Sequence, residues 1–263
     1  MIYVKNKRTA IGLLALLLCA TLTALPCAAR TVETVSVHVN GRPLYAEQPL
    51  LIDGKTYVSL DALRAALGDR TGTPVSADGR VLRAGSRCIY MSAEAFTENQ
   101  MLYIPLRAAA TLYGAEIRWD AGAGCASFYS MRRSMLSAES VYNEEDLYWM
   151  SRIISAESRG EPLEGKLAVG TVVCNRVDSE EFPSTITEVI FDRQYGVQFT
   201  PVANGTVYDD PTQESVDAAK MILEGYRTDP EVLYFIYEDI ATNKWTVYNC
   251  SYAFTIGCHD FYS

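Results

Sequence analysis

Glu157 stands out because it is a carboxylate on an otherwise apolar helix face. Leu147, Met150 and Ile153 recur at helical spacing, and at about 100° per residue Glu157 falls within the same arc. A carboxyl group on a buried face, near the negatively polarised C-terminal end of a helix, resists ionisation. Such a group can donate a proton at neutral pH, which is the task of a general acid. The alternative is that Glu157 turns towards solvent where the last helical turn frays.

The helix that would carry this glutamate has recognisable ends. Asn143 can cap its start, and the acidic residues 144–146 suit the positively polarised first turn. Gly160 is expected to end the helix, and Pro162 is placed to begin the next one. Because Glu161 lies in this break, helical spacing does not place its carboxylate.

Two further helix starts are marked along the chain. Asp210 is expected to cap a helix over residues 211–225, which Gly225 ends. Thr185, followed three residues later by Glu188, forms a capping box for a shorter helix. The second half of the chain is therefore predicted to be mainly helical.

The first half contains an internal repeat. Residues 57–60 (Tyr-Val-Ser-Leu) and 103–106 (Tyr-Ile-Pro-Leu) each lead into a short helical segment, which Gly68 ends in one copy and Gly114 in the other. Residues 35–39 alternate between apolar and polar side chains, as a half-buried strand does. The pattern predicts a small, duplicated α+β unit.

Composition and charge divide the chain into two parts. Of its 263 residues, 49% are hydrophobic, which excludes a mainly disordered protein, and the net charge of −9 argues against a nucleic-acid binder. Residues 30–138 carry 12 basic and 10 acidic side chains, whereas residues 139–263 carry 8 and 22, a net charge of −14. We therefore predict an α+β protein with an N-terminal domain over 30–129, a linker over 130–142 and a C-terminal domain over 143–263.

The first 29 residues have the features of a secretory signal peptide. Lys5, Lys7 and Arg8 precede an apolar run over 10–25, and small residues follow up to Ala29. We expect cleavage after Ala29, export of the mature chain and no membrane span after cleavage. An uncleaved membrane anchor is the alternative.

Several ordered blocks of the C-terminal half resemble the SleB-type cell-wall hydrolases, which include the germination-specific spore cortex-lytic enzymes. The blocks are Ile154-Ser-Ala-Glu-Ser-Arg-Gly-Glu-Pro-Leu-Glu-Gly165, Ala168-Val-Gly-Thr-Val-Val-Cys-Asn-Arg176, Phe182-Pro-Ser-Thr-Ile186, Gln198-Phe-Thr200, Lys244-Trp245 and Ile256-Gly257 with His259 and Phe261. The resemblance implies a lysozyme-like, mainly helical fold that cleaves the peptidoglycan glycan strand, with its single catalytic glutamate at Glu157. It also implies a protein of the cell wall or spore envelope, on which a wall or spore-coat protein could act as regulator.

In the lytic transglycosylases this glutamate protonates the glycosidic oxygen and then acts as a base while a 1,6-anhydromuramoyl ring closes. One carboxylate can suffice because the second nucleophile belongs to the substrate. A hydrolase of the muramidase type would use the same acid with a second carboxylate roughly 5–10 Å away. Both reactions remain open on the sequence.

Two groups of side chains are candidates for holding the glycan. The polar candidates, on family-matching positions, are Arg159, Glu161, Asn175 and Arg176. The aromatic candidates, which could stack on sugar rings, are Phe199, Tyr234 and Trp245. Helix capping, charge pairing or core packing would explain the same residues without any role in binding the glycan.

Two rival functions use this sequence differently. A cysteine peptidase or amidase would need a thiolate beside a histidine, as Cys174 and His259 could supply, but Cys174 falls on an apolar helix stripe where a thiolate is disfavoured. A non-catalytic wall-binding protein is the second rival. Cys88 with Cys125, and Cys250 with Cys258, are possible disulfides.

The N-terminal half resembles the domain called copper amine oxidase N-terminal-like. The resemblance covers roughly residues 33–128 and rests on Asn40-Gly41, Asp53-Gly54, Tyr103-Ile-Pro-Leu-Arg107 and Trp119-Asp120. Copper(II) favours imidazole ligands, and this half contains only His38. We therefore predict a wall-associated module with no metal, and no cofactor in either half.

Overall fold

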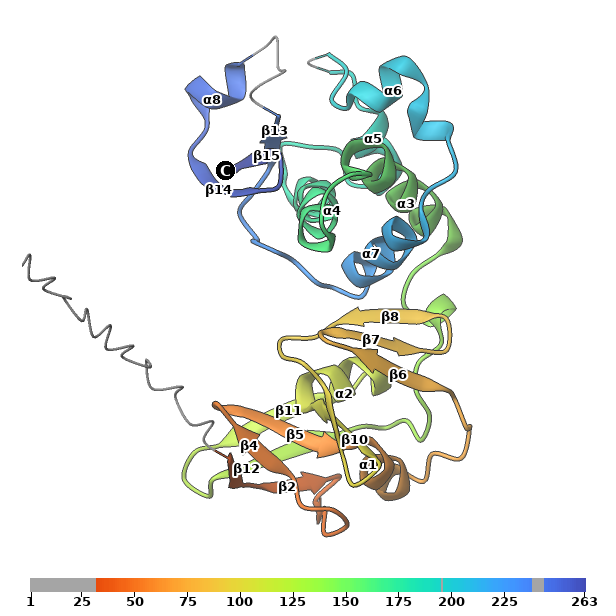
Figure 1. The fold of residues 1–263 in the computed structure, drawn as a ribbon, viewed down its shortest axis with the longest axis vertical. Helices are drawn as coiled ribbons and strands as arrows, with labels where there is room; N and C mark the ends of the chain where they lie inside the picture. The colour runs from red at the N-terminus through yellow and green to blue at the C-terminus, as the bar shows by residue number, and fades with distance from the viewer. Residues whose placement is uncertain (1–31, 195, 238–243) are drawn as a thin grey trace, which may run out of the picture.

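The computed structural model describes residues 32–194, 196–237 and 244–263, and the predicted signal peptide lies outside them. The described chain is an α+β protein. Its N-terminal region is rich in sheets and its C-terminal domain is mainly helical (Figure 1). The buried hydrophobic side chains form one large cluster in each part. No described helix has the length and apolar character that crossing a membrane requires.

The repeat in the N-terminal region is confirmed. Strand β5 (Lys55–Ser59) runs into helix α1 (Leu60–Leu67), and strand β10 (Met101–Pro105) runs into helix α2 (Leu106–Tyr113). The two strands pair antiparallel, with Tyr103 opposite Ser59. The two copies therefore meet at the centre of one sheet.

Three sheets make up the N-terminal region. In the order in which the strands pair, the first sheet is β1 (Val32–Thr34), β4 (Leu50–Ile52), β5, β10 and β9 (Phe96–Glu98). The second is β11 (Glu116–Asp120), β12 (Cys125–Tyr129), β2 (Ser36–Val39) and β3 (Arg42–Pro43). The third is β6 (Val75–Asp78), β7 (Val81–Ala84) and β8 (Arg87–Tyr90). In β2, Val37 and Val39 are buried and His38 alternates with them, as the sequence pattern predicts.

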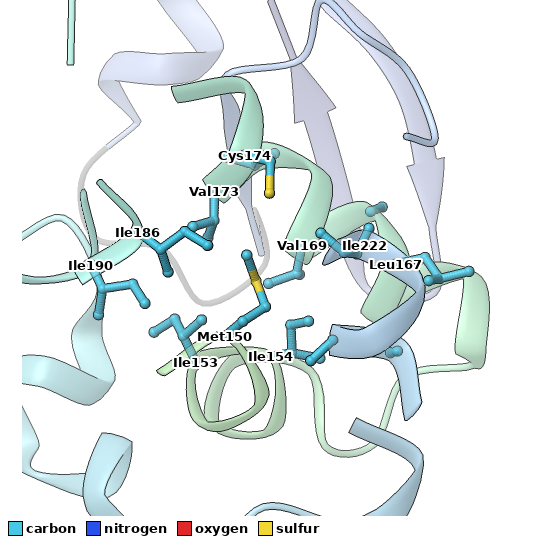
Figure 2. Packing of buried hydrophobic residues seen from close by; sticks show 14 of the residues in the cluster. Met150, Ile153, Ile154, Leu167, Val169, Val173, Cys174, Ile186, Ile190 and Ile222 are labelled. Atoms are coloured by element: carbon cyan, nitrogen blue, oxygen red, sulfur yellow. The ribbon is translucent and has the colours of Figure 1, made fainter. Parts of the chain in front are cut away.

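Helices α3 (Glu144–Ser158), α4 (Leu163–Asp178) and α7 (Gln213–Leu223) form the centre of the C-terminal domain. Asn143 caps α3 by accepting the Asp146 N–H at 2.7 Å, which confirms the predicted helix start. Gly170 lets the three helices approach closely, since a Cβ there would lie 2.8 Å from Ile222 and 2.9 Å from Ile154. Figure 2 shows these two isoleucines packed with Met150 and other apolar side chains of the cluster.

Shorter elements complete the C-terminal domain. They are α5 (Ile186–Phe191), α6 (Thr200–Asn204), α8 (Trp245–Asn249) and the 3-10 turns Ala138–Ser140 and Thr206–Tyr208. A three-stranded sheet pairs in the order β13 (Tyr234–Ile236), β15 (His259–Tyr262) and β14 (Tyr252–Ile256). Thr185 caps α5 as predicted, by accepting the Glu188 N–H at 3.2 Å.

The predicted start of α7 was wrong by two residues. Thr212 is the cap, because its hydroxyl accepts the Ser215 N–H at 3.2 Å. Asp210 instead points into solvent and pairs with Arg152 at 3.1 Å.

The suggested disulfides are not formed. All five cysteines of the described residues are free. Cys88 packs into the hydrophobic cluster of the C-terminal domain, whereas Cys125 lies on strand β12 of the N-terminal region. Burial raises the pKa of the Cys88 thiol to about 12, so this cysteine is a small buried apolar group.

A buried arginine joins the two parts of the chain. Strand β8 faces helix α7 (Figure 1), and Arg87 on β8 forms a two-point ion pair with Glu224, which follows α7. The Arg87 guanidinium also donates to the carbonyls of Thr111, Leu112 and Leu136 at 3.0–3.3 Å. Both charged side chains are almost fully buried, at 1% and 2% exposed. The N-terminal region is thus fixed to the C-terminal domain through a fully hydrogen-bonded pair.

Candidate active site

Glu157 lines a cavity of about 610 Å³ in the C-terminal domain. The cavity lies between the end of α3, the segment around α6 and the β13–β15 sheet. Its walls include Glu161, Phe199, Tyr237 and His259. The side of α3 that carries Met150, Ile153 and Ile154 is buried in the core, and the glutamate in its last turn reaches the cavity edge.

The environment of Glu157 favours its protonated form. Burial raises the pKa of Glu157 to about 7, and desolvation is the cause. Among the described residues, no cation or hydrogen-bond donor contacts its carboxyl group to offset this cost. The side chain can therefore be both proton donor and proton acceptor near neutral pH.

Glu161 reaches the same cavity from the turn between α3 and α4. Its Oε2 accepts the backbone N–H of Cys258 at 3.1 Å, which ties this turn to the β14–β15 hairpin. Gly257 has a left-handed backbone (φ 59°), and a Cβ there would overlap the Glu161 carboxylate. A larger residue there would strain the backbone and displace the end of the Glu161 side chain. The long-range contact explains why spacing could not place Glu161.

His259 lies beside Glu161, with 3.9 Å between its Nδ1 and Oε1 of the carboxylate. Burial lowers the pKa of His259, and the charge of Glu161 opposes the shift in part. The imidazole is therefore largely neutral at neutral pH. Its ring packs edge-on against Phe235, with centroids 5.3 Å apart.

A second cavity, of about 1130 Å³, continues from the first. The two share Arg176, Gln198 and Phe235 as wall residues, so they form one extended groove. Tyr234 and Trp245 line the second cavity, with ring centroids 6.0 Å apart, and Trp245 is 52% exposed. Of the aromatic residues proposed from sequence, Phe199 is a buried wall of the first cavity and these two border the second.

Cys174 is not placed to act with His259. It lies on α4 inside the hydrophobic cluster (Figure 2) and lines neither cavity of the groove. Burial raises the pKa of its thiol to about 11, which suppresses the thiolate that a cysteine nucleophile requires. The cysteine-peptidase alternative is therefore unsupported by the geometry.

Two sequence-predicted residues lie outside the groove. Asn175 is buried, and its Nδ2 donates to the carbonyls of Asp229 and Val232 at 2.9 and 2.8 Å. Its amide therefore holds the chain that leads into β13. Arg159 is exposed and donates to the carbonyl of Asp210 at 3.1 Å.

Sequence reasoning missed Phe235, which borders both cavities. Its neighbour Tyr234 was proposed because an aromatic face can stack on a sugar ring, while a phenylalanine in a strand-like run is expected to pack in the core. No described residues form a cluster of three or more potential metal ligands.

The C-terminal part of the chain is similar to known proteins. Residues 160–262 match the family model of Cell Wall Hydrolase. A spore cortex-lytic enzyme of Bacillus cereus is 38% identical over 104 residues, which cover 40% of this chain and 39% of that protein. The spore cortex-lytic enzyme of Bacillus subtilis is 33% identical over 104 residues, covering 40% of this chain and 33% of that protein. The alignments thus span less than half the length of either relative.

A solved structure is also similar. It is the catalytic domain of the germination-specific lytic transglycosylase SleB from Bacillus anthracis, with 35% identity and a TM-score of 0.42, over 46% of this chain and 97% of that one. The family match begins three residues after Glu157, so the position of this glutamate rests on the geometry of the cavity. Residues 160–262 of this chain thus match the Cell Wall Hydrolase family model and are similar in sequence to spore cortex-lytic enzymes.

Proposed function

We propose that the C-terminal domain cleaves the glycan strand of peptidoglycan as a lytic transglycosylase, with Glu157 as its acid and base. The observation that carries this proposal is the place of Glu157, at a helix end on the edge of a groove and with a pKa of about 7. The names of the relatives, spore cortex-lytic enzymes, support a cell-wall glycan as the substrate class.

The proposed reaction needs only one protein carboxyl group. Protonated Glu157 donates its proton to the glycosidic oxygen as the bond between that oxygen and C1 of the muramoyl residue breaks. The carboxylate then takes the proton of the muramoyl 6-hydroxyl, whose oxygen bonds to C1. No water is consumed, and Glu157 returns to its protonated form. A pKa near ambient pH suits a group that must perform both transfers.

Short-range contacts in the groove would hold the strand. Trp245 and Tyr234 offer aromatic faces to sugar rings in the second cavity. Because the C-terminal part carries a net charge of −14 and wall polymers are themselves anionic, long-range attraction does not recruit the substrate. Stacking and hydrogen bonds must supply the affinity.

The second candidate function is a hydrolase of the muramidase type, and it is suggested by the position of Glu161. Its carboxylate lines the same cavity as Glu157, as a base that activates water would need to. Against this role, Oε2 of Glu161 already accepts the Cys258 N–H. The products distinguish the two reactions, because the transglycosylase leaves 1,6-anhydromuramoyl ends and the hydrolase leaves reducing ends.

We also propose that the chain is exported and acts in the cell wall or spore envelope, with a lysozyme-like catalytic domain. The N-terminal region, which resembles the copper amine oxidase N-terminal-like domain, would serve as a wall-associated module. The Arg87–Glu224 pair would hold it in a fixed position relative to the groove. A wall or spore-coat protein remains the proposed regulator.

The test is mass spectrometry of the fragments that the full chain releases from purified spore cortex and from vegetative sacculi. We expect anhydro-ended glycan fragments from at least one of them. Fragments cut only within the peptides would refute the proposal.

A further inference from the structure

Arg176 lies where the two cavities meet and lines both of them. It is near the C-terminal end of α4 and only 5% exposed. Although burial lowers the pKa of Arg176 to about 10, the guanidinium is still protonated at neutral pH. A buried positive charge is costly unless an anion or several acceptors compensate it.

The described residues compensate this charge only in part. Arg176 Nε donates to the Leu233 carbonyl at 2.8 Å, and Nη1 has a long contact of 3.5 Å with Oε1 of Gln198. No ion pair to Arg176 is formed within the described chain, and Asp192 acts on it only as a more distant charge. Its Nη2 donates to no acceptor among these residues.

Three aromatic rings surround the guanidinium. Its Cζ lies 4.9 Å from the ring centroid of Phe182, 5.3 Å from that of Phe199 and 5.4 Å from that of Tyr234. These rings exclude water from the sides and hold the planar group in place. The local dielectric constant is therefore low, which strengthens any hydrogen bond that a ligand accepts from the free donors.

Arg87 shows how the same chain treats a buried structural arginine. Its guanidinium has Glu224 as a two-point partner and donates to three further carbonyls. Within the part of the chain that the structure describes, Arg176 has one short hydrogen bond, and it faces the groove. The contrast indicates that an external anion is the missing partner of Arg176.

We propose that Arg176 binds a carboxylate of the glycan strand at the junction of the two cavities. The inference rests on the proposed function, since it assigns a substrate group to the same groove. Two carboxylates of peptidoglycan have the required chemistry. One is the lactyl carboxylate of a muramoyl residue that lacks its stem peptide, and the other belongs to the stem peptide.

The experiment uses the full chain and four soluble substrates from one preparation of glycan strands. Two are peptide-free and two retain stem peptides, and within each pair one member has its carboxylates converted to neutral amides. We compare kcat/KM for the charged and the neutral member of each pair. The proteins are the wild type, Arg176→Met, Arg176→Lys and the control Arg227→Met, which removes a C-terminal-domain arginine that lines neither cavity of the groove.

We expect the wild type to prefer the charged member of one pair by roughly ten- to a hundredfold, the range of a hydrogen bond between charged groups. Arg176→Met should lose that preference, Arg176→Lys should keep part of it, and Arg227→Met should keep all of it. The preference is the ratio of two kcat/KM values measured on the same protein. Partial unfolding of a variant lowers both values by the same factor and so leaves the ratio unchanged.

The substrate pair that shows the preference identifies the carboxylate. A preference in the peptide-free pair assigns the lactyl carboxylate, and a preference in the other pair assigns a carboxylate of the stem peptide. An equal preference in the wild type and Arg176→Met, or no preference in the wild type, would overturn the assignment of Arg176. A wild type that cuts none of the four substrates would instead refute the proposed function.

Discussion

Arg87 and Glu224 form a two-point ion pair that is almost fully buried between strand β8 and the end of helix α7. The residues are 137 positions apart in the chain. Their pairing makes the N-terminal region and the C-terminal domain one hydrogen-bonded unit, in which the segment predicted as a linker contributes the Leu136 carbonyl.

Arg87→Met should lower the free energy of unfolding by about 3–5 kcal/mol, because it leaves the Glu224 carboxylate buried without a partner. The double variant Arg87→Met/Glu224→Gln should recover part of this loss, since the stranded charge is removed. Urea denaturation of the three proteins measures both effects. A loss below about 1 kcal/mol in the single variant would mean that water replaces the arginine.

Glu157→Gln should stabilise the fold above pH 7. The pKa of Glu157 is raised from 4.5 to about 7 in the folded state, so the folded protein binds this proton more tightly than the unfolded chain. The wild type therefore loses stability as the pH rises from about 4.5 to about 7, by about 3 kcal/mol in all. The variant has no such loss.

Thermal denaturation at about pH 4 and about pH 8 tests this. We expect the wild type and Glu157→Gln to have similar melting temperatures at the lower pH. At the higher pH, Glu157→Gln should have the higher melting temperature. The control is Glu188→Gln, which changes an exposed glutamate in the first turn of α5. Equal melting temperatures at both values would show that Glu157 ionises freely in the folded protein.

Gly257→Ala should disturb the site through Glu161. A Cβ at Gly257 would overlap the Glu161 carboxylate, and the backbone there is left-handed. We expect a roughly tenfold or greater loss of activity, because the carboxylate and the β14–β15 hairpin must move apart. Gly225→Ala is the matched control, since Gly225 is also left-handed (φ 97°) but a Cβ there would meet nothing within 4 Å.

Stability measurements separate the two parts of this effect. In both Gly257→Ala and Gly225→Ala, backbone strain should lower the free energy of unfolding by about 1–3 kcal/mol. Only Gly257→Ala should lose more than this. The double variant Glu161→Ala/Gly257→Ala should be less destabilised than the sum of its single changes, because the overlap is gone. Strict additivity would contradict the contact between Gly257 and the Glu161 carboxylate.

The sequence predicted the features that depend on short spacing. The partly buried position of Glu157 near the end of α3 could be predicted because helical periodicity over residues 147–157 relates it to the apolar side, and Asn143 because a cap bonds within its own turn. The cap of α7 was misplaced because Asp210 and Thr212 are both good caps, and the hydroxyl of Thr212 makes the bond.

Features that join distant segments could not be found in this way. Glu161 meets Cys258, 97 positions away, through a hairpin whose geometry no local pattern fixes. The same holds for the Arg87–Glu224 pair. Asn175 and Arg176 are neighbours in the sequence, yet the amide bonds two carbonyls inside the protein while the guanidinium faces the groove.

The central claim is that Glu157 is the acid and base of glycan cleavage, and the most direct measurement compares the products of the wild type and Glu157→Gln by mass spectrometry. We predict that the wild type releases 1,6-anhydromuramoyl fragments, one water lighter than hydrolytic ones. Glu157→Gln should be folded and slower by about 10²–10⁴, while Glu161→Gln and Glu164→Gln, the latter in the first turn of α4, lose much less. Full activity of folded Glu157→Gln would contradict the account.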